Sequence, residues 1–139
     1  MYKSILVPLD GSKLAENILT EVEELAVLLN ARLNLINVRK AHVLPGVDPT
    51  DSQVRVVREA QEYLENLKGT LSTKIIGFKL HTPYGNPADK ILEVSKRDDI
   101  DLIAMSTHGR SGIGRWLLGS VAETRSSKSR SVFYPIYRF

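Results

Sequence analysis

Glycine and serine are concentrated in residues 105–123, which read MSTHGRSGIGRWLLGSVAE. This segment holds four of the nine glycines, and Gly119 and Ser120 precede a stretch predicted as a helix. The first N–H groups of a helix have no partner in the helix and carry partial positive charge. A glycine before them lets an anion approach, and a serine adds a hydroxyl donor. The pattern fits a phosphate site, and it fits a flexible turn with a helix cap equally well.

Positive charge is concentrated at the same end of the chain. Residues 108–139 contain six Lys and Arg against one Glu, a net charge of +5 in a chain whose total is +3. Such a field attracts anions such as phosphates, although a solvated basic face gives the same count.

Two common phosphate-binding motifs do not match. A Walker A loop needs a Gly-Lys pair, which Gly11-Ser12-Lys13 lacks. A dinucleotide fingerprint that starts at Gly112 would need a third glycine where Leu117 stands. We therefore exclude a hydride-transfer enzyme.

Short apolar runs alternate with amphipathic stretches. Strands are predicted at residues 3–9, 32–38, 74–80, 100–106 and 131–137. Helices are predicted at residues 15–29, 54–71, 87–98 and 119–129. This alternation predicts an α/β fold, an open sheet with parallel strands and helices on both faces.

Three sequence signals mark helix starts. Ser12 is the predicted N-cap of the first helix, and Asn86 with Pro87 starts the third. Thr50 and Gln53 match a capping box for the long second helix.

Length and composition predict one domain over residues 1–139. The chain has no cysteine, no signal-peptide pattern and no apolar run long enough to span a membrane. We expect a soluble cytoplasmic protein with no disulfide, no thiolate metal site and no membrane partner.

The chain resembles the universal stress protein family along nearly its whole length. The matching segments are ILVPLDGS (5–12), LNLINV (33–38), YGNPADKIL (84–92) and DLIAMSTHGRSGIGRWLLGSVAE (101–123), with a closing strand. ATP-binding members carry G-x2-G-x9-G-[ST]. Gly109, Gly119 and Ser120 match its second half, and Ser106 stands in place of its first glycine.

The resemblance implies an open five-stranded parallel sheet of order 3-2-1-4-5, similar to the adenine-nucleotide alpha-hydrolase fold. It also implies ATP, with Mg²⁺, at the carboxyl ends of the strands. Asp10 would lie at the ribose, and the backbone of Val38 would pair with the adenine edge. The implied binding residues are Pro8, Leu9, Asp10, Val38, Met105, Ser106, His108, Gly109, Arg110, Gly119, Ser120, Val121 and Ala122.

Two departures from the family pattern affect this expectation. Ser106 would cost about 1 kcal/mol if its position required a positive φ. Pro135 removes a backbone donor from the last strand, which favours an edge strand or a strand with a break. The family commonly dimerises through this strand, so we expect a homodimer through the C-terminal strand whose geometry the proline leaves open.

The remaining polar residues are predicted to be structural or exposed. His42 and His81 have no metal-ligand companions at useful spacing. Asp98, Asp99 and Asp101 could hold a metal, but they precede the fourth strand, away from the predicted site, and a solvated turn is the expectation.

The predicted function is that of an ATP-binding universal stress protein, a small stress-response or signalling protein that is not an efficient enzyme. No general base, arginine finger or metal-binding Asp set can be assigned, so any ATP hydrolysis would be slow. The first alternative is a dimeric interaction module of the same fold that has lost nucleotide binding, which Ser106 favours. An adenylating or nucleotide-cleaving enzyme is weaker, because PLDGSK has only one glycine, and nucleic-acid binding lacks an aromatic-basic platform.

Overall fold

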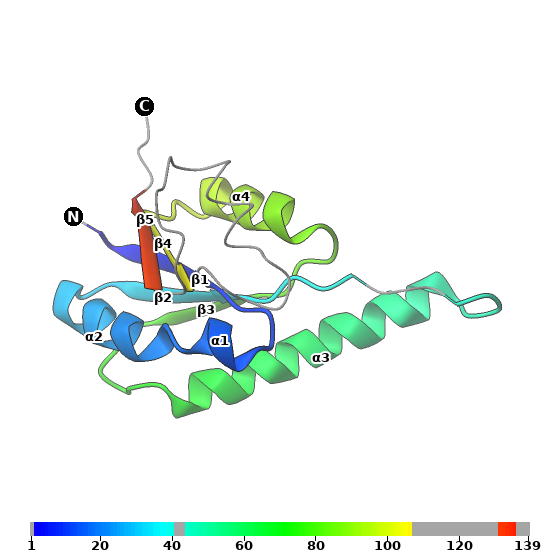
Figure 1. Cartoon of the computed structure of the whole chain (residues 1–139), viewed down its shortest axis with the longest axis horizontal. Coiled ribbons are helices and arrows are strands. Elements are labelled where there is room, and N and C mark those ends of the chain that lie inside the picture. The colour runs from blue at the N-terminus through cyan, green and yellow to red at the C-terminus, as the bar shows by residue number, and fades with distance from the viewer. Residues whose placement is uncertain (1, 41–43, 107–130, 136–139) are drawn as a thin grey trace.

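The computed structural model describes residues 2–40 and 44–106 and the backbone of residues 131–135. The described elements follow the predicted alternation of strands and helices (Figure 1). In chain order they are β1 (Ser4–Pro8), α1 (Lys13–Glu16), α2 (Leu19–Leu29), β2 (Arg32–Ile36), α3 (Pro49–Thr70), β3 (Phe78–His81), α4 (Pro87–Arg97), β4 (Leu102–Ser106) and β5 (Ser131–Pro135).

The strands form one sheet in the order β3-β2-β1-β4-β5. The pairs β1–β2, β1–β4 and β2–β3 are parallel, which confirms the predicted α/β sheet for these four strands. The prediction that all five strands are parallel is wrong, because β5 runs antiparallel to β4. Ser131 pairs with Ser106, so the chain re-enters the sheet beside the end of β4, at its carboxyl edge. A parallel β5 would have required a crossover back to the other edge.

Pro135 lies at the end of β5 and pairs with Leu102. Because β5 is the last strand in the sheet order, the expectation of an edge strand is confirmed. A residue without an N–H is tolerated there, since no further strand needs that donor.

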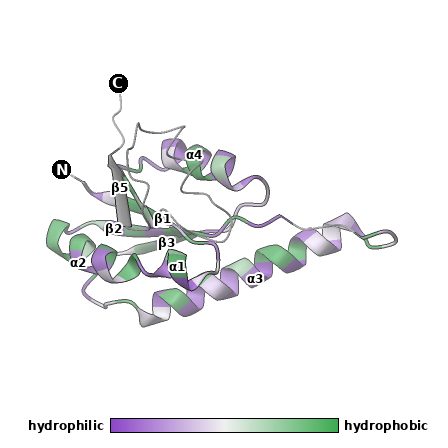
Figure 2. Ribbon diagram, viewed as in Figure 1, coloured by the Kyte–Doolittle hydropathy of each residue, from purple (hydrophilic) through white to green (hydrophobic). Residues whose placement is uncertain are grey.

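Two apolar clusters lie on opposite faces of the sheet. Helices α1, α2 and α3 cover one face and α4 covers the other (Figure 1). The larger cluster includes Val7, Val22 and Leu64, and the smaller one includes Leu6 and Ile91. Figure 2 shows hydrophobic and hydrophilic residues alternating along the helices, as expected of helices that bury one face.

Two of the three predicted helix caps are confirmed. The side chain of Ser12 accepts a hydrogen bond from the N–H of Ala15, and that of Asn86 accepts one from Asp89. The long helix α3 begins earlier than the capping box predicts. Asp48 is its N-cap, accepting from the N–H of Thr50 at 2.8 Å, and Pro49 is its first residue.

Two other predicted elements differ in extent. The helix predicted over residues 15–29 is divided into α1 and α2. The strand predicted over residues 74–80 is shorter, because residues 74–77 form a turn and bends before β3. Ile75 is nevertheless buried in the larger cluster, so its hydrophobicity reflects burial rather than a strand.

None of the helices in the described part of the chain is long and apolar enough to cross a bilayer.

Candidate functional site

The carboxyl ends of β1, β2 and β3 are joined by a short hydrogen-bonded network. Leu9 donates its N–H to the carbonyl of Ile36 at 2.9 Å, which closes the β1–β2 ladder. Asn37 is buried, and its Nδ2 donates to the carbonyl of Leu9 at 2.8 Å. The N–H of Asn37 donates to the carbonyl of His81 on β3 at 3.0 Å. The polar edge of the sheet is thus held rigidly just where β1 ends.

The backbone N–H and C=O groups of Val38 lie at this edge of the sheet. The N–H groups of its neighbours Asn37 and Arg39 both donate toward β3, to His81 and Pro83. Successive residues of an extended chain point their backbone groups to opposite sides, so the N–H and C=O of Val38 point toward the end of β1. Within the described residues neither group has a hydrogen-bond partner.

The N–H and C=O groups of Val38 have a fixed direction. Val38 is half-buried, and its side chain packs with the cluster under α4, which fixes the direction of the backbone. A donor and an acceptor lie side by side on one residue and face the same way. Buried backbone groups are nearly always paired, so two backbone groups with no partner among the described residues suit a ligand that offers an acceptor next to a donor.

The loop between β1 and α1 forms the next wall. One carboxylate oxygen of Asp10, Oδ1, accepts from the N–H of Ser12 at 2.9 Å and from its hydroxyl at 2.6 Å. Gly11 lies between them with φ of +88°, a conformation that glycine adopts without strain. The Asp10 carboxylate is therefore fixed at the strand end next to the backbone of Val38.

Tyr63 of α3 forms hydrogen bonds with the loop between β1 and α1 and with α1 itself. Its hydroxyl donates to Oε2 of Glu16 at 2.7 Å, and the backbone of Gly11 also hydrogen-bonds to it. Burial raises the pKa of Tyr63 well above its usual value, and the hydrogen bond to the Glu16 carboxylate raises it further. The phenol is therefore neutral at ordinary pH and acts as a fixed donor.

Arg39 places a cation on the α3 side of the same edge. Its Nε donates to Oδ1 of Asn37 at 2.8 Å, and its NH1 lies 3.6 Å from a carboxylate oxygen of Glu59. The side chain is one-third exposed. The guanidinium is thus held at the sheet edge by the same asparagine that fixes Val38.

The end of β4 shows how the two predicted residues there are placed. The side chain of Met105 is buried in the cluster under α4, and its backbone lies in β4, where Met105 pairs with Val132 of β5. Ser106 is half-buried and ends the strand. In the described part of the chain only Asn30 and Asp99 are non-glycine residues with positive φ, so the backbone strain considered for Ser106 does not arise.

Six predicted site residues thus meet at one edge of the sheet: Pro8, Leu9, Asp10, Val38, Met105 and Ser106. The others lie outside the described residues: His108, Gly109, Arg110, Gly119, Ser120, Val121 and Ala122. The helix predicted over residues 119–129 lies outside them too. Residues 37–39 follow a predicted strand and were expected near the site, but no role was predicted for Asn37 or Arg39, and Tyr63 of α3 was missed.

Residues 98–99 form the predicted turn and Asp99 is exposed, but Asp98 and Asp101 are not solvated as predicted. Oδ2 of Asp101 accepts from the N–H groups of Lys3 and Ser4 at 2.7 and 2.9 Å, tying β1 to β4. The side chain of Asp98 is only 9% exposed and lies 2.8 Å from Arg97 and 2.9 Å from Lys79. Hydrogen bonds from Arg97 and Lys79 lower the pKa of Asp98 to about 2.

His81 is structural, as predicted, and it is buried. Nδ2 of Asn34 donates to the hydroxyl of Ser4 and the carbonyl of Ile5, so Oδ1 of Asn34 faces Nε2 of His81 at 3.2 Å. This assigns the proton of the neutral ring to Nε2. Burial lowers the pKa of His81, and Asp98, 3.7 Å from Nδ1, opposes that shift. Across the described ranges no three His, Asp or Glu side chains group as metal ligands.

Comparison with known proteins identifies the family of this chain. The model of the universal stress protein family matches residues 1–130. The chain belongs to the universal stress protein family. A curated relative, universal stress protein MJ0531 of Methanocaldococcus jannaschii, is 32% identical over 130 residues, which cover 88% of this chain and 75% of the relative.

Solved universal stress proteins share the fold. One from Burkholderia pseudomallei has a TM-score of 0.71 at 24% identity, covering 87% of this chain and 92% of its own. Another, solved in complex with cAMP, has a TM-score of 0.57 at 21% identity and covers 86% of each chain. At these identities the likeness concerns the fold.

Proposed function

We propose that this universal stress protein binds ATP at the carboxyl ends of β1 and β4 and acts as a nucleotide-dependent stress or signalling protein. The observation that carries the proposal is the backbone of Val38, a half-buried residue whose N–H and C=O have no partner among the described residues. Adenine offers a ring nitrogen acceptor beside an amino donor, which matches this pair. The complex of another family member with cAMP, an adenine nucleotide, supports the same choice of ligand class.

The other described groups suit the sugar that would follow the base. Asp10 supplies a fixed carboxylate at the end of β1, and a carboxylate can accept hydrogen bonds from ribose hydroxyls, as the acidic residue of dinucleotide-binding folds does. Ser106 ends β4, the strand on the other side of β1, without backbone strain. The phosphates would lie beyond these residues, at Gly109, Gly119 and Ser120, which remain sequence-based predictions.

Mg²⁺ would enter with the triphosphate. This ion is commonly held by phosphate oxygens, waters and one or two carboxylates, so it needs no preformed protein cage. Asp10 is the one described carboxylate that we place beside the ligand, and its Oδ1 is already engaged by Ser12. The proposal therefore assigns no protein ligand to the ion.

We do not propose efficient catalysis. Tyr63 is a neutral phenol with a raised pKa, and Arg39 is held by Asn37 and Glu59, so neither is placed as a base or a free arginine finger. The protein would hold ATP, and any hydrolysis of the bound nucleotide would be slow. The cytoplasmic location and the homodimer through the C-terminal strand also remain predictions.

The proposal is tested by the nucleotide content of the full-length protein. Protein purified without added nucleotide is denatured, and the released small molecules are identified by mass. Emptied protein is then titrated calorimetrically with ATP, and GTP serves as the control because its base exchanges the donor and acceptor positions. We expect copurified adenine nucleotide and binding of ATP well above that of GTP.

The opposite result favours the alternative of an interaction module that has lost nucleotide binding. Protein that is empty as purified, and that gives no heat with ATP, ADP or cAMP, would overturn the proposal. The exposed apolar grooves on α2 and α3 give that alternative its structural basis.

A further inference from the structure

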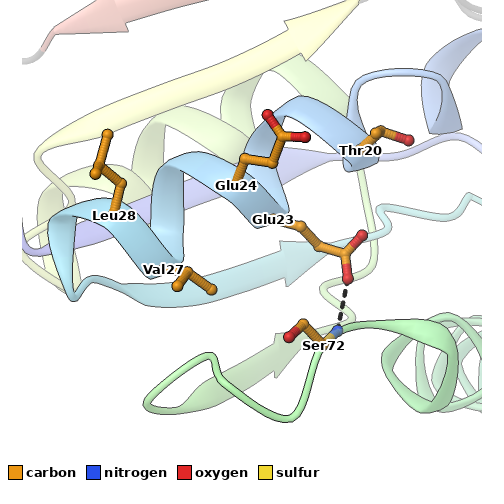
Figure 3. A pocket seen from close by; sticks show the side chains of 6 residues that line it. All are labelled: Thr20, Glu23, Glu24, Val27, Leu28 and Ser72. Carbon is orange, nitrogen blue, oxygen red and sulfur yellow. Dashed lines mark hydrogen bonds between the residues drawn. The ribbon is translucent and has the colours of Figure 1, made fainter.

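A groove on the outer side of α2 combines acid with exposed apolar surface (Figure 3). It has a volume of about 440 Å³ and is lined by Thr20, Glu23, Glu24, Val27, Leu28 and Ser72. Leu28 is 81% exposed and Val27 is 38% exposed, although both belong to a helix that packs on the core. Oε1 of Glu23 accepts from the N–H of Ser72 at 2.6 Å, which joins the two walls of the groove.

The charge of this surface has one sign. The two charged residues that line the groove, Glu23 and Glu24, are both acidic, in a chain whose net charge is +3. Glu23 is engaged with Ser72, whereas Glu24 is exposed and has no ion-pair partner within the described residues. An occupant of the groove must therefore offer apolar side chains for Val27 and Leu28 and a cation for Glu24.

A second groove, on α3, offers that chemistry. It has a volume of about 500 Å³ and is lined by Thr50, Gln53, Val54, Val57, Arg58 and Gln61. Val54 is 50% exposed. Arg55 is paired with Glu59 at 3.9 Å, whereas the exposed Arg58 has no ion-pair partner in the described part of the chain. The N-terminal half of α3, which carries this groove, extends past the sheet and the other helices. It lies at the opposite end of the molecule from the C-terminal end of α2 (Figure 1).

The two grooves match in spacing as well as in chemistry. Glu24 and Leu28 are four residues apart on α2, and Val54 and Arg58 are four residues apart on α3, about 6 Å in each helix. When the helices run antiparallel, Glu24 faces Arg58 and Leu28 faces Val54. Each helix presents side chains at steps of three and four residues, the pattern with which helices pack against each other.

We propose that these two grooves bind each other between copies of this chain: the α2 groove of one copy receives the α3 groove of the next. The two surfaces differ, so the contact is heterologous, and every copy keeps one free surface of each kind. Association therefore continues head to tail, into an open chain or a closed ring. Six residues a side are far fewer than the roughly 20–30 of a stable interface, so the assembly is weak and depends on protein concentration.

The experiment measures the weight-average mass of the full-length protein by analytical ultracentrifugation, at protein concentrations up to about 1 mM. Glu24→Lys and Arg58→Glu each place like charges in the contact. The control, Glu93→Lys, changes the charge of α4 on the opposite face of the sheet, where it removes only a surface pair with Lys90. We expect wild type and the control to grow in mass with concentration, and each groove variant to lose at least about tenfold in association constant.

Mixing the two groove variants gives the decisive result. In an equimolar mixture the altered α2 groove of Glu24→Lys meets the altered α3 groove of Arg58→Glu, with the two charges exchanged. The unaltered grooves of the two variants also meet, so opposite charges face each other in every contact and association returns to near the wild-type level. Misfolding of either variant cannot produce that recovery.

Four outcomes would overturn the proposal. Three of them are a constant mass for wild type, growth that persists in either variant alone, and a mixture that stays unassociated. The fourth is binding of a synthetic Lys/Leu amphipathic peptide to a wild type that does not self-associate, which would favour a foreign cationic helix as the occupant.

Discussion

The role proposed for the backbone N–H of Val38 can be tested by removing its hydrogen. In the variant Val38→Pro the ring replaces the N–H that we assign to the base. No described residue accepts a hydrogen bond from this N–H, so the substitution breaks no internal hydrogen bond among them. The residue before a proline must be extended, and Asn37 is the extended continuation of β2, bonded to β3. The fold should therefore tolerate the change.

The expected loss of affinity follows from the burial of the site. A base bound at the half-buried Val38 would keep a ring nitrogen without its donor, which costs about 1–3 kcal/mol. That range corresponds to roughly 5- to 150-fold weaker binding of ATP. The assay is calorimetric titration of emptied protein, and thermal unfolding verifies that the variant is folded.

A matched variant separates the backbone from the side chain. Val38→Ala keeps the N–H but removes two methyl groups from the cluster under α4. We expect it to lower the thermal midpoint and to leave the affinity for ATP within about threefold of wild type. A folded Val38→Pro protein that binds ATP as tightly as wild type would refute the assignment of the base to this edge.

Three further predictions concern the described framework. Asp101→Ala removes the carboxylate that accepts from two backbone N–H groups and so joins β1 to β4. We expect about 2 kcal/mol of destabilisation in urea unfolding. A change below about 0.5 kcal/mol would show that water replaces the carboxylate. Gly11→Ala meets no neighbouring atom within 4 Å but keeps φ at +88°, so we expect a loss of about 1 kcal/mol from backbone strain alone; unchanged stability would mean that the loop relaxes. Burial lowers the pKa of His81, so the folded state binds a proton less readily than the unfolded state, and stability should fall as the pH drops below about 6.5. Nitrogen NMR should show the Nε2–H tautomer with a pKa below 6.5, and a higher pKa would mean that the Asp98 carboxylate outweighs burial.

Local and periodic signals in the sequence predicted much of the fold. Ser12 and Asn86 were identified as caps because a short polar side chain before an amphipathic run has few other roles. The cap of α3 was misplaced by two residues because Asp48-Pro49 competes with the T-x-x-Q pattern that follows it. The order of the four parallel strands came from the family resemblance, and the structure agrees with it.

Long-range contacts were the part that the sequence did not reveal. The direction of β5 depends on where the chain re-enters the sheet, which no local pattern encodes. Asp101 and Asp98 look like a solvated acidic turn in the sequence, yet their partners come from β1 and β3. The candidate site remains a prediction: six of its residues lie at one edge of the sheet, but the hydrogen bonds of Asn37 that direct the backbone of Val38 toward β1 appear only when three strands are assembled.

The most direct test of the central claim is the amide NMR spectrum of the full-length protein during titration with ATP. We expect a large shift of the Val38 amide, with smaller shifts at Asp10 and Gly11, because the base would accept a hydrogen bond from Val38 beside that loop. Amides of the α2 groove should not move. Saturation with ATP that leaves the Val38 amide in place would contradict the account.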